Sequence, residues 1–101
     1  VALQGPKSRD ILLSLPVTAE DRKKIMALKR TQLCEAVVAG IDLVVSRTGY
    51  TGEKMAFELF VHPDQAVALW QALIEAGAPL GLKPCGLGAR DSLRTEAGLP
   101  L

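Results

Sequence analysis

Residues 47–59, RTGYTGEKMAFEL, connect one predicted strand to the next. The glycines in this stretch indicate a turn, and after the turn Glu58 stands between Phe57 and Leu59. Because the side chains of a strand alternate between its two faces, Phe57 and Leu59 share one face, and Glu58 shares the other with Phe60. An apolar ring beside a carboxylate is not typical of a solvated face. The pattern therefore predicts a sheet whose outer face is also covered, by another domain or by a ligand.

Three further segments read as strands. Residues 32–40 and 41–49 form a predicted hairpin around Gly40, and residues 55–63 hold the strand with Glu58. Residues 1–6, VALQGP, are a short strand that ends at a Gly-Pro stop.

Helical spacing of apolar residues predicts four helices, over residues 7–15, 18–28, 64–81 and 89–98. Thr18 is a good N-cap for the second of these helices.

The third predicted helix, DQAVALWQALIEAGAPLG (64–81), has the clearest apolar stripe. We expect Asp64 to be its N-cap, Trp70 to lie in the core, and Gly77 to end it as a C-terminal glycine.

This order of elements is typical of an α+β domain: a ferredoxin-like antiparallel sheet with helices packed on one face. A final strand is expected near Leu80–Pro84 or outside these residues. The 101 residues suffice for a single domain, 1–101, and we expect them to be a fragment of a longer protein.

Composition excludes several functions. With 12 basic and 11 acidic residues, the net charge of +1 predicts no binding to nucleic acid or membranes. Cys34 and Cys85 do not form a metal-binding pair, so no metal site is expected, and both are interpreted as buried or half-buried thiols of a reducing compartment. In an isolated fragment the covered outer face of the sheet would be exposed, and self-association of the fragment is therefore expected.

Two sets of residues are candidates for binding. Glu58 needs a partner, which is either an arginine of this chain or a ligand with two adjacent N–H donors, such as an aminopyrimidine. Arg90 and Arg94 share one face of the last predicted helix and could hold a carboxylate or phosphate. The alternative for this helix is a solvated surface on which Asp91 pairs with Arg94.

Two long motifs resemble the glycine cleavage system T-protein (aminomethyltransferase) family. SRTGYTGEKMAFELFV (46–61) is similar to its Arg-Thr-Gly-Tyr-Thr-Gly-Glu signature, and LGLKPCGLGARDSLRTEAGLPL (80–101) is similar to its Gly-Leu-Gly-Ala-Arg-Asp block. VALQGPKS (1–8) is similar to a strand–helix segment of the family. The resemblance implies that the chain is the central folate-binding region of a larger protein.

By this resemblance, Glu58 lies at the pterin end of a folate site, Arg90 is a further substrate-binding residue, and Tyr50 lines the site. The segment EKMAFE (53–58) departs from the family pattern by one extra residue and lacks its glycine. The catalytic aspartate of the family lies outside this chain. We therefore expect the parent protein to be an enzyme and the isolated fragment to be inactive.

The resemblance also implies a reaction and partners. The family moves an aminomethyl carbon from the lipoyl arm of the H-protein to tetrahydrofolate, its co-substrate, and releases ammonia. The expected location is the cytoplasm of a bacterium or the mitochondrial matrix. Two alternatives are the folate-binding module of a sarcosine or dimethylglycine oxidoreductase and a non-catalytic folate-binding accessory protein. The Lys-Gly-Cys-Tyr motif of the accessory proteins does not occur here.

Overall fold

The computed structural model describes all residues, 1–101. The elements follow the order expected from the sequence. They are β1 (Ala2–Gln4), α1 (Ser8–Ser14), α2 (Ala19–Ala27), β2 (Leu33–Val38), β3 (Ile41–Ser46), β4 (Ala56–Val61), the 3-10 turn η1 (Pro63–Gln65), α3 (Ala66–Gly77), the 3-10 turn η2 (Ala78–Leu80) and α4 (Leu87–Glu96).

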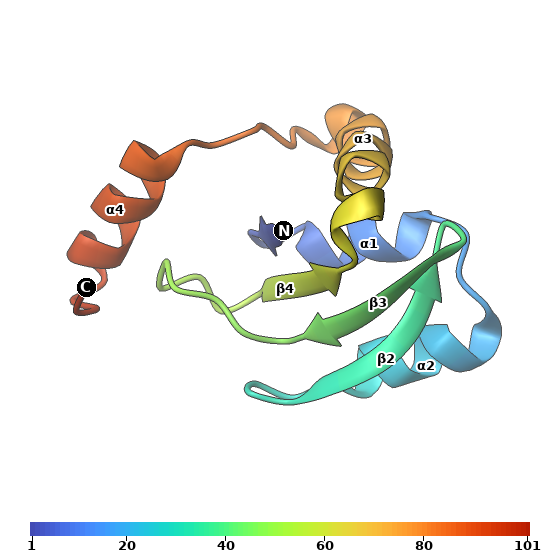
Figure 1. The fold of residues 1–101 in the computed structure, drawn as a ribbon. Coiled ribbons are helices and arrows are strands. Elements are labelled where there is room, and N and C mark those ends of the chain that lie inside the picture. The colour runs from blue at the N-terminus through green and yellow to red at the C-terminus, as the bar shows by residue number, and fades with distance from the viewer.

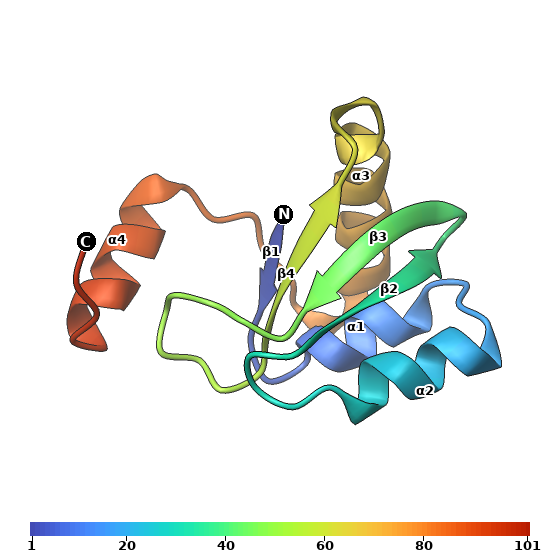
Figure 2. The ribbon, with the colours of Figure 1, turned by 60° about the horizontal axis from the view of Figure 1, so that its bottom comes forward.

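The strands form one sheet in the order β1-β4-β3-β2, and every neighbouring pair is antiparallel. Helices α1, α2 and α3 lie on one face of this sheet, whereas α4 stands beyond β1 at the end of an extended segment (Figures 1 and 2). The expected α+β class, with an antiparallel sheet covered on one face by helices, is confirmed.

The prediction of a strand near Leu80–Pro84 is wrong. This segment holds the end of η2, then Gly81 with a φ of +86°, and then an extended connection to α4. The Leu82 N–H donates to the Gly77 carbonyl at 3.0 Å, which holds the chain against the end of α3 and away from the sheet.

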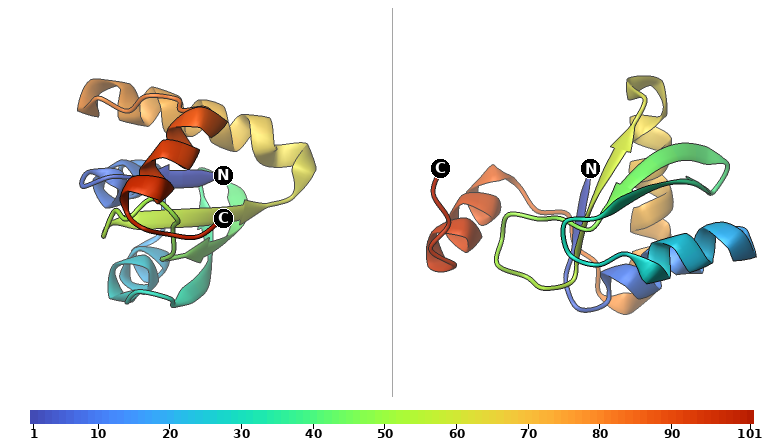
Figure 3. Two further views of the ribbon diagram at one scale, coloured as in Figure 1. Left: turned by 90° about the vertical axis from the view of Figure 1, so that its left-hand side faces the viewer. Right: turned by 90° about the horizontal axis from the view of Figure 1, so that it is seen from below.

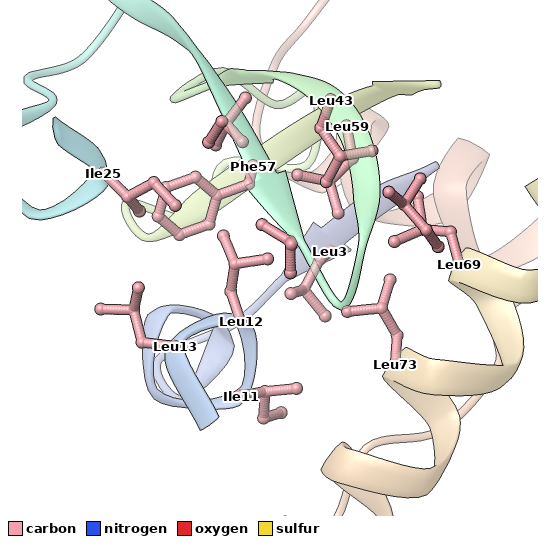
Figure 4. Packing of buried hydrophobic residues seen from close by; sticks show 14 of the residues in the cluster. Leu3, Ile11, Leu12, Leu13, Ile25, Leu43, Phe57, Leu59, Leu69 and Leu73 are labelled. Atoms are coloured by element: carbon pink, nitrogen blue, oxygen red, sulfur yellow. The ribbon is translucent and has the colours of Figure 1, made fainter. Parts of the chain in front are cut away.

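The core lies between the sheet and the three helices. Phe57 and Leu59 of β4 are fully buried there, as their alternation with Glu58 and Phe60 predicts. In Figure 4 the Phe57 ring projects from β4 toward Ile25 of α2 and Leu12 of α1. Burial of large apolar side chains between the two layers is the main stabilising contribution in this fold.

The structure confirms two local features that the sequence predicts: the cap of α2 and the turn between β2 and β3. The Thr18 hydroxyl accepts a hydrogen bond from the Asp21 N–H at 3.2 Å and caps α2. Ala39 and Gly40 have φ angles of 51° and 75°, which is the conformation of a tight hairpin turn between β2 and β3.

Asp21 also connects α2 to the sheet. Its Oδ2 atom accepts a hydrogen bond from the Val37 N–H of β2 at 3.0 Å, and its Oδ1 atom lies 3.1 Å from the Lys24 ammonium. The Val37 N–H, and then Lys24, stabilise the carboxylate, and together they lower the pKa of Asp21.

α3 ends at Gly77 as expected, but its beginning differs from the expectation. His62, not Asp64, caps the 3-10 turn that precedes it, because the His62 Nδ1 atom accepts the Asp64 N–H at 3.2 Å. Gly77 is the last residue of α3, but its φ of −88° is ordinary for any residue. A Cβ atom at Gly77 would lie 2.5 Å from the Leu82 Cβ, so the glycine is required by close packing.

Candidate functional site

Glu58 lies on the outer face of the sheet, opposite the three helices. Its cross-strand partners are Ser46 on β3 and Ala2 on β1. The side chain is half-buried, and it forms no salt bridge and no side-chain hydrogen bond with residues 1–101. The arginine partner considered for Glu58 is therefore not found in this chain.

Apolar and polar side chains are mixed around Glu58 on this face. Phe60, two residues further along β4, is 56% exposed, and Leu33 of β2 is 63% exposed. Between β4 and β2, the buried Ser46 lies opposite Glu58 and Leu33, and the half-buried Val44 lies opposite Phe60. A carboxylate that is partly removed from water and has no partner is costly, whereas a ligand with N–H donors would offset that cost.

A groove of about 620 Å³ runs beside β1, between the sheet edge and α4. The residues that line it come from β1, the tip of the 47–55 turn, α3, the 82–86 segment and α4. Figure 3 shows how these elements are arranged. Apolar side chains line the groove from both helices: Trp70, Leu73 and Ile74 from α3, and Leu87 and Leu93 from α4.

Arg90 lines this groove from α4, and Lys83 lines it from the segment before α4. Arg94 has a different role, because its guanidinium donates to the Leu99 carbonyl at 3.1 Å and pairs with Asp91. Arg94 therefore forms the ordinary surface pair with Asp91 that the alternative interpretation predicted. Arg90 remains free to bind an anion in the groove.

Tyr50 lies in the turn between β3 and β4, and its hydroxyl donates a hydrogen bond to the Pro100 carbonyl. In the same turn, a Cβ atom at Gly52 would lie 2.6 Å from the Ala97 Cβ. The turn thus packs closely on the C-terminal end of α4. The two motifs that carry the family resemblance are in direct contact, although they are far apart in the sequence.

Arg47, the first residue of the 47–53 motif, has a structural role. Its Nη1 atom donates to the Leu28 carbonyl at 2.8 Å, and its backbone pairs with Gln32 and Thr31. These contacts fix the connection between α2 and β2 and set the point at which the turn leaves the sheet.

The three predicted site residues are placed around one end of the sheet. Arg90 lines the groove, and Thr51 and Gly52, which follow Tyr50, line it too. Glu58 is one strand further in, since its partner Ala2 lines the groove from β1. Of the three, only Arg90 lines the groove itself; Glu58 and Tyr50 each lie next to a residue that does.

Two groove residues were interpreted incorrectly from the sequence. Trp70 was expected in the core but is 44% exposed in the groove wall. Cys85 was expected to be buried or half-buried but is exposed beside Gly86, whereas Cys34 is half-buried as expected. The only sequence signal for Trp70 was its large size within the apolar stripe, which does not say what covers it.

The two thiols are predicted to differ in reactivity. Burial raises the pKa of Cys34, so less of its reactive thiolate is present at neutral pH, and Cys85 is exposed. Alkylation of the 101-residue chain, followed by peptide mass spectrometry, is expected to modify Cys85 at least about 10-fold faster than Cys34. The Cys85→Ser variant should retain only the slow reaction; equal rates at both thiols would contradict the prediction.

Residues 1–101 contain no group of three or more His, Cys, Asp or Glu side chains placed to hold a metal ion. None of the helices has the length and apolar character needed to cross a membrane.

Comparison with known proteins identifies relatives along the whole chain. The family model described as GCVT N-terminal domain matches residues 1–101. A protein of Streptomyces avermitilis named aminomethyltransferase is 54% identical over 101 residues, and one of Bacillus cereus with the same name is 52% identical. A third aminomethyltransferase, from Alkaliphilus metalliredigens, is 48% identical. Each of these alignments covers the whole of this chain, and the chain spans 26% of the length of each relative.

Proposed function

Because the chain belongs to the GCVT N-terminal domain family, we propose that it forms part of the folate site of a tetrahydrofolate-dependent aminomethyltransferase of the glycine cleavage system. The relatives that support this proposal are named aminomethyltransferase, so the parent protein is of the transferase class. The proposed reaction takes the aminomethyl group from the lipoyl sulfur of an H-protein. Its carbon is passed to tetrahydrofolate as 5,10-methylenetetrahydrofolate, ammonia leaves, and the lipoyl dithiol remains.

The observation that carries the proposal is the half-buried, unpaired carboxylate of Glu58 on the outer face of the sheet. The two oxygens of a carboxylate match two parallel N–H donors, and the aminopyrimidine edge of a pterin presents such a pair. In this proposal Glu58 accepts both hydrogen bonds and fixes the orientation of the pterin. The exposed side chains of Phe60 and Leu33 add apolar surface on the same face.

Arg90 and Tyr50 have supporting roles in this proposal. The Arg90 guanidinium is proposed to bind a carboxylate of the co-substrate, since folate carries its carboxylates at the end opposite the pterin. The Tyr50 hydroxyl already donates a hydrogen bond to the Pro100 carbonyl, so this residue would contribute the face of its ring to the site. The catalytic carboxylate is proposed to come from the rest of the parent protein, in the bacterial cytoplasm or the mitochondrial matrix.

Calorimetric titration of the full-length parent with tetrahydrofolate tests the role of Glu58. Glu58→Gln keeps the shape of the side chain but replaces one acceptor oxygen with an amide donor. We expect it to lose about 2 kcal/mol of binding free energy, or about 30-fold in Kd, as for a buried charged hydrogen bond. Glu35→Gln is the matched control, because Glu35 is an exposed carboxylate on the same outer face.

Arg90→Ala tests the proposed contact between Arg90 and the carboxylate of the co-substrate in the same titration. Arg30→Ala, on the opposite side of the sheet, is its control. Both controls are expected to bind tetrahydrofolate like the wild type. If Glu58→Gln and Arg90→Ala also bind like the wild type, Glu58 is not the pterin ligand and the proposed site is wrong.

A further inference from the structure

Residues 5–8, which follow β1, fix the base of the 47–55 turn. The Gly5 N–H and the Ser8 hydroxyl both donate to the Met55 carbonyl, at 2.9 and 3.2 Å. Ser8 is buried, and Met55 is the residue before β4. The turn therefore joins β4 at a point that the segment after β1 holds in place.

Gln4, the last residue of β1, reaches further into the same turn. Its side-chain Oε1 atom accepts a hydrogen bond from the Thr51 hydroxyl, and Gln4 is half-buried. A Cβ atom at Gly49 would lie 3.1 Å from the Gln4 Nε2 atom and 2.7 Å from the Cβ of Ala56, the cross-strand partner of Gln4. The Gln4 side chain is thus close to the residues that precede and follow Tyr50 in the sequence.

The tip of this turn determines where α4 lies. None of the α4 residues is buried, so no buried side chain anchors this helix within residues 1–101. The Tyr50 hydroxyl bonds to the Pro100 carbonyl after the helix, and Gly52 packs closely on Ala97. Figure 2 shows the turn between β3 and β4 reaching from the sheet toward α4. Because Arg90 is part of α4, its position depends on the turn.

We propose that Gln4 is a positioning residue of the folate site, a role that rests on the proposed function. β1 pairs with β4, so Gln4 connects the strand of Glu58 to the turn and, through the turn, to α4. In the proposed function Glu58 binds the pterin, and Arg90 binds a carboxylate at the opposite end of the co-substrate. A ligand held at both ends needs these two groups at a fixed separation, and fixing it before the ligand arrives lowers the cost of binding.

The hydrogen bond between Gln4 and Thr51 suits this role because both residues are half-buried. A hydroxyl that loses its acceptor in such a place keeps a donor that is partly removed from water, which is costly. Outward movement of the turn would return the hydroxyl to water, but it would carry Tyr50 and α4 with it. Loss of the Gln4 acceptor is therefore expected to displace the turn.

Gln4→Met tests this role, because methionine has about the length of glutamine and its sulfur is only a weak acceptor for the Thr51 hydroxyl. In a calorimetric titration of the full-length parent with tetrahydrofolate, we expect Gln4→Met to raise the Kd about 10-fold. In the Arg90→Ala background the same substitution should change the Kd less than about 2-fold, because the contact that it positions is already lost. In the Glu58→Gln background it should still raise the Kd about 10-fold. Gln71→Met, on the exposed side of α3, is the control and should bind like the wild type.

Thr51→Val removes the other partner of the hydrogen bond and leaves β1 unchanged. It should also raise the Kd about 10-fold, and the double variant with Gln4→Met should bind no more weakly than either single variant. The positioning role is overturned if Gln4→Met costs the same with and without Arg90, or if Thr51→Val binds like the wild type.

The same titrations separate this role from the proposed function. If the wild type does not bind tetrahydrofolate, or if Arg90→Ala has no effect, the proposed function is wrong and the role of Gln4 falls with it. If the wild type binds and Arg90→Ala weakens binding, but Gln4→Met binds like the wild type, only the role of Gln4 is wrong.

Discussion

Phe57→Ala is expected to lower the unfolding free energy of the 101-residue chain by about 3–5 kcal/mol, in the range found for the truncation of a buried phenylalanine. The Phe57 ring is fully buried and projects from the beginning of β4 toward α1 and α2. Its removal leaves a cavity where three elements meet. Domains of this size are stable by about 5–15 kcal/mol, so the loss removes a large share of the stability.

Urea denaturation followed by far-UV circular dichroism measures this effect. Phe60→Ala is the matched control, because Phe60 lies on the same strand but on the outer face, where it is 56% exposed. We expect the control to lose less than about 1 kcal/mol. Equal losses for the two variants would mean that the faces of β4 are assigned the wrong way round.

Gly77→Ala is expected to destabilise the chain by about 1–2 kcal/mol, although alanine favours a helix over glycine by about 1 kcal/mol. The new methyl group would lie 2.5 Å from the Leu82 Cβ, which is too close for any real contact. Because the Cβ of Leu82 is fixed to its backbone, the segment that leads to α4 would have to move. The loss should therefore be accompanied by faster proteolysis between residues 80 and 87.

A double-mutant cycle isolates this clash. Leu82→Ala alone removes apolar packing, and in the Gly77→Ala background it also shortens the side chain that the new methyl group crowds. The two losses are expected to be less than additive, as for residues in contact. Strict additivity of the unfolding free energies would show that the cost of Gly77→Ala arises elsewhere.

Most of the fold could be predicted from the sequence, because its signals are local. The alternation around Glu58 assigns the two faces of β4, and Ala39–Gly40 closes the β2–β3 hairpin by its own backbone conformation. Side-chain packing is what these local signals do not show. Gly77 was expected to end α3 as a C-terminal glycine and does end it, but the approach of Leu82, which requires a glycine there, was not predicted.

The candidate site was predictable in its members but not in its shape. The sequence identifies Glu58 by its apolar neighbours. It does not show that Glu58 has no arginine partner, because that depends on the course of the whole chain. Trp70 lies on the stripe that faces the sheet, and periodicity cannot show that the sheet ends beneath it. Contact between the 47–53 turn and α4 likewise arises from the extended connection before α4, for which the sequence has no periodic signal.

The contact between Asp21 and Val37 has a consequence for the direction in which the sheet can grow. At β2, one of the outward N–H groups that an added chain would need, that of Val37, is already bound by a carboxylate, and the charge repels further acceptors. Since the pKa of Asp21 is lowered, this block persists as the pH falls below the usual range of an aspartate and weakens only when the carboxylate is protonated. Edge-to-edge pairing of copies, which leads to fibrous aggregates, is therefore hindered at this position of β2.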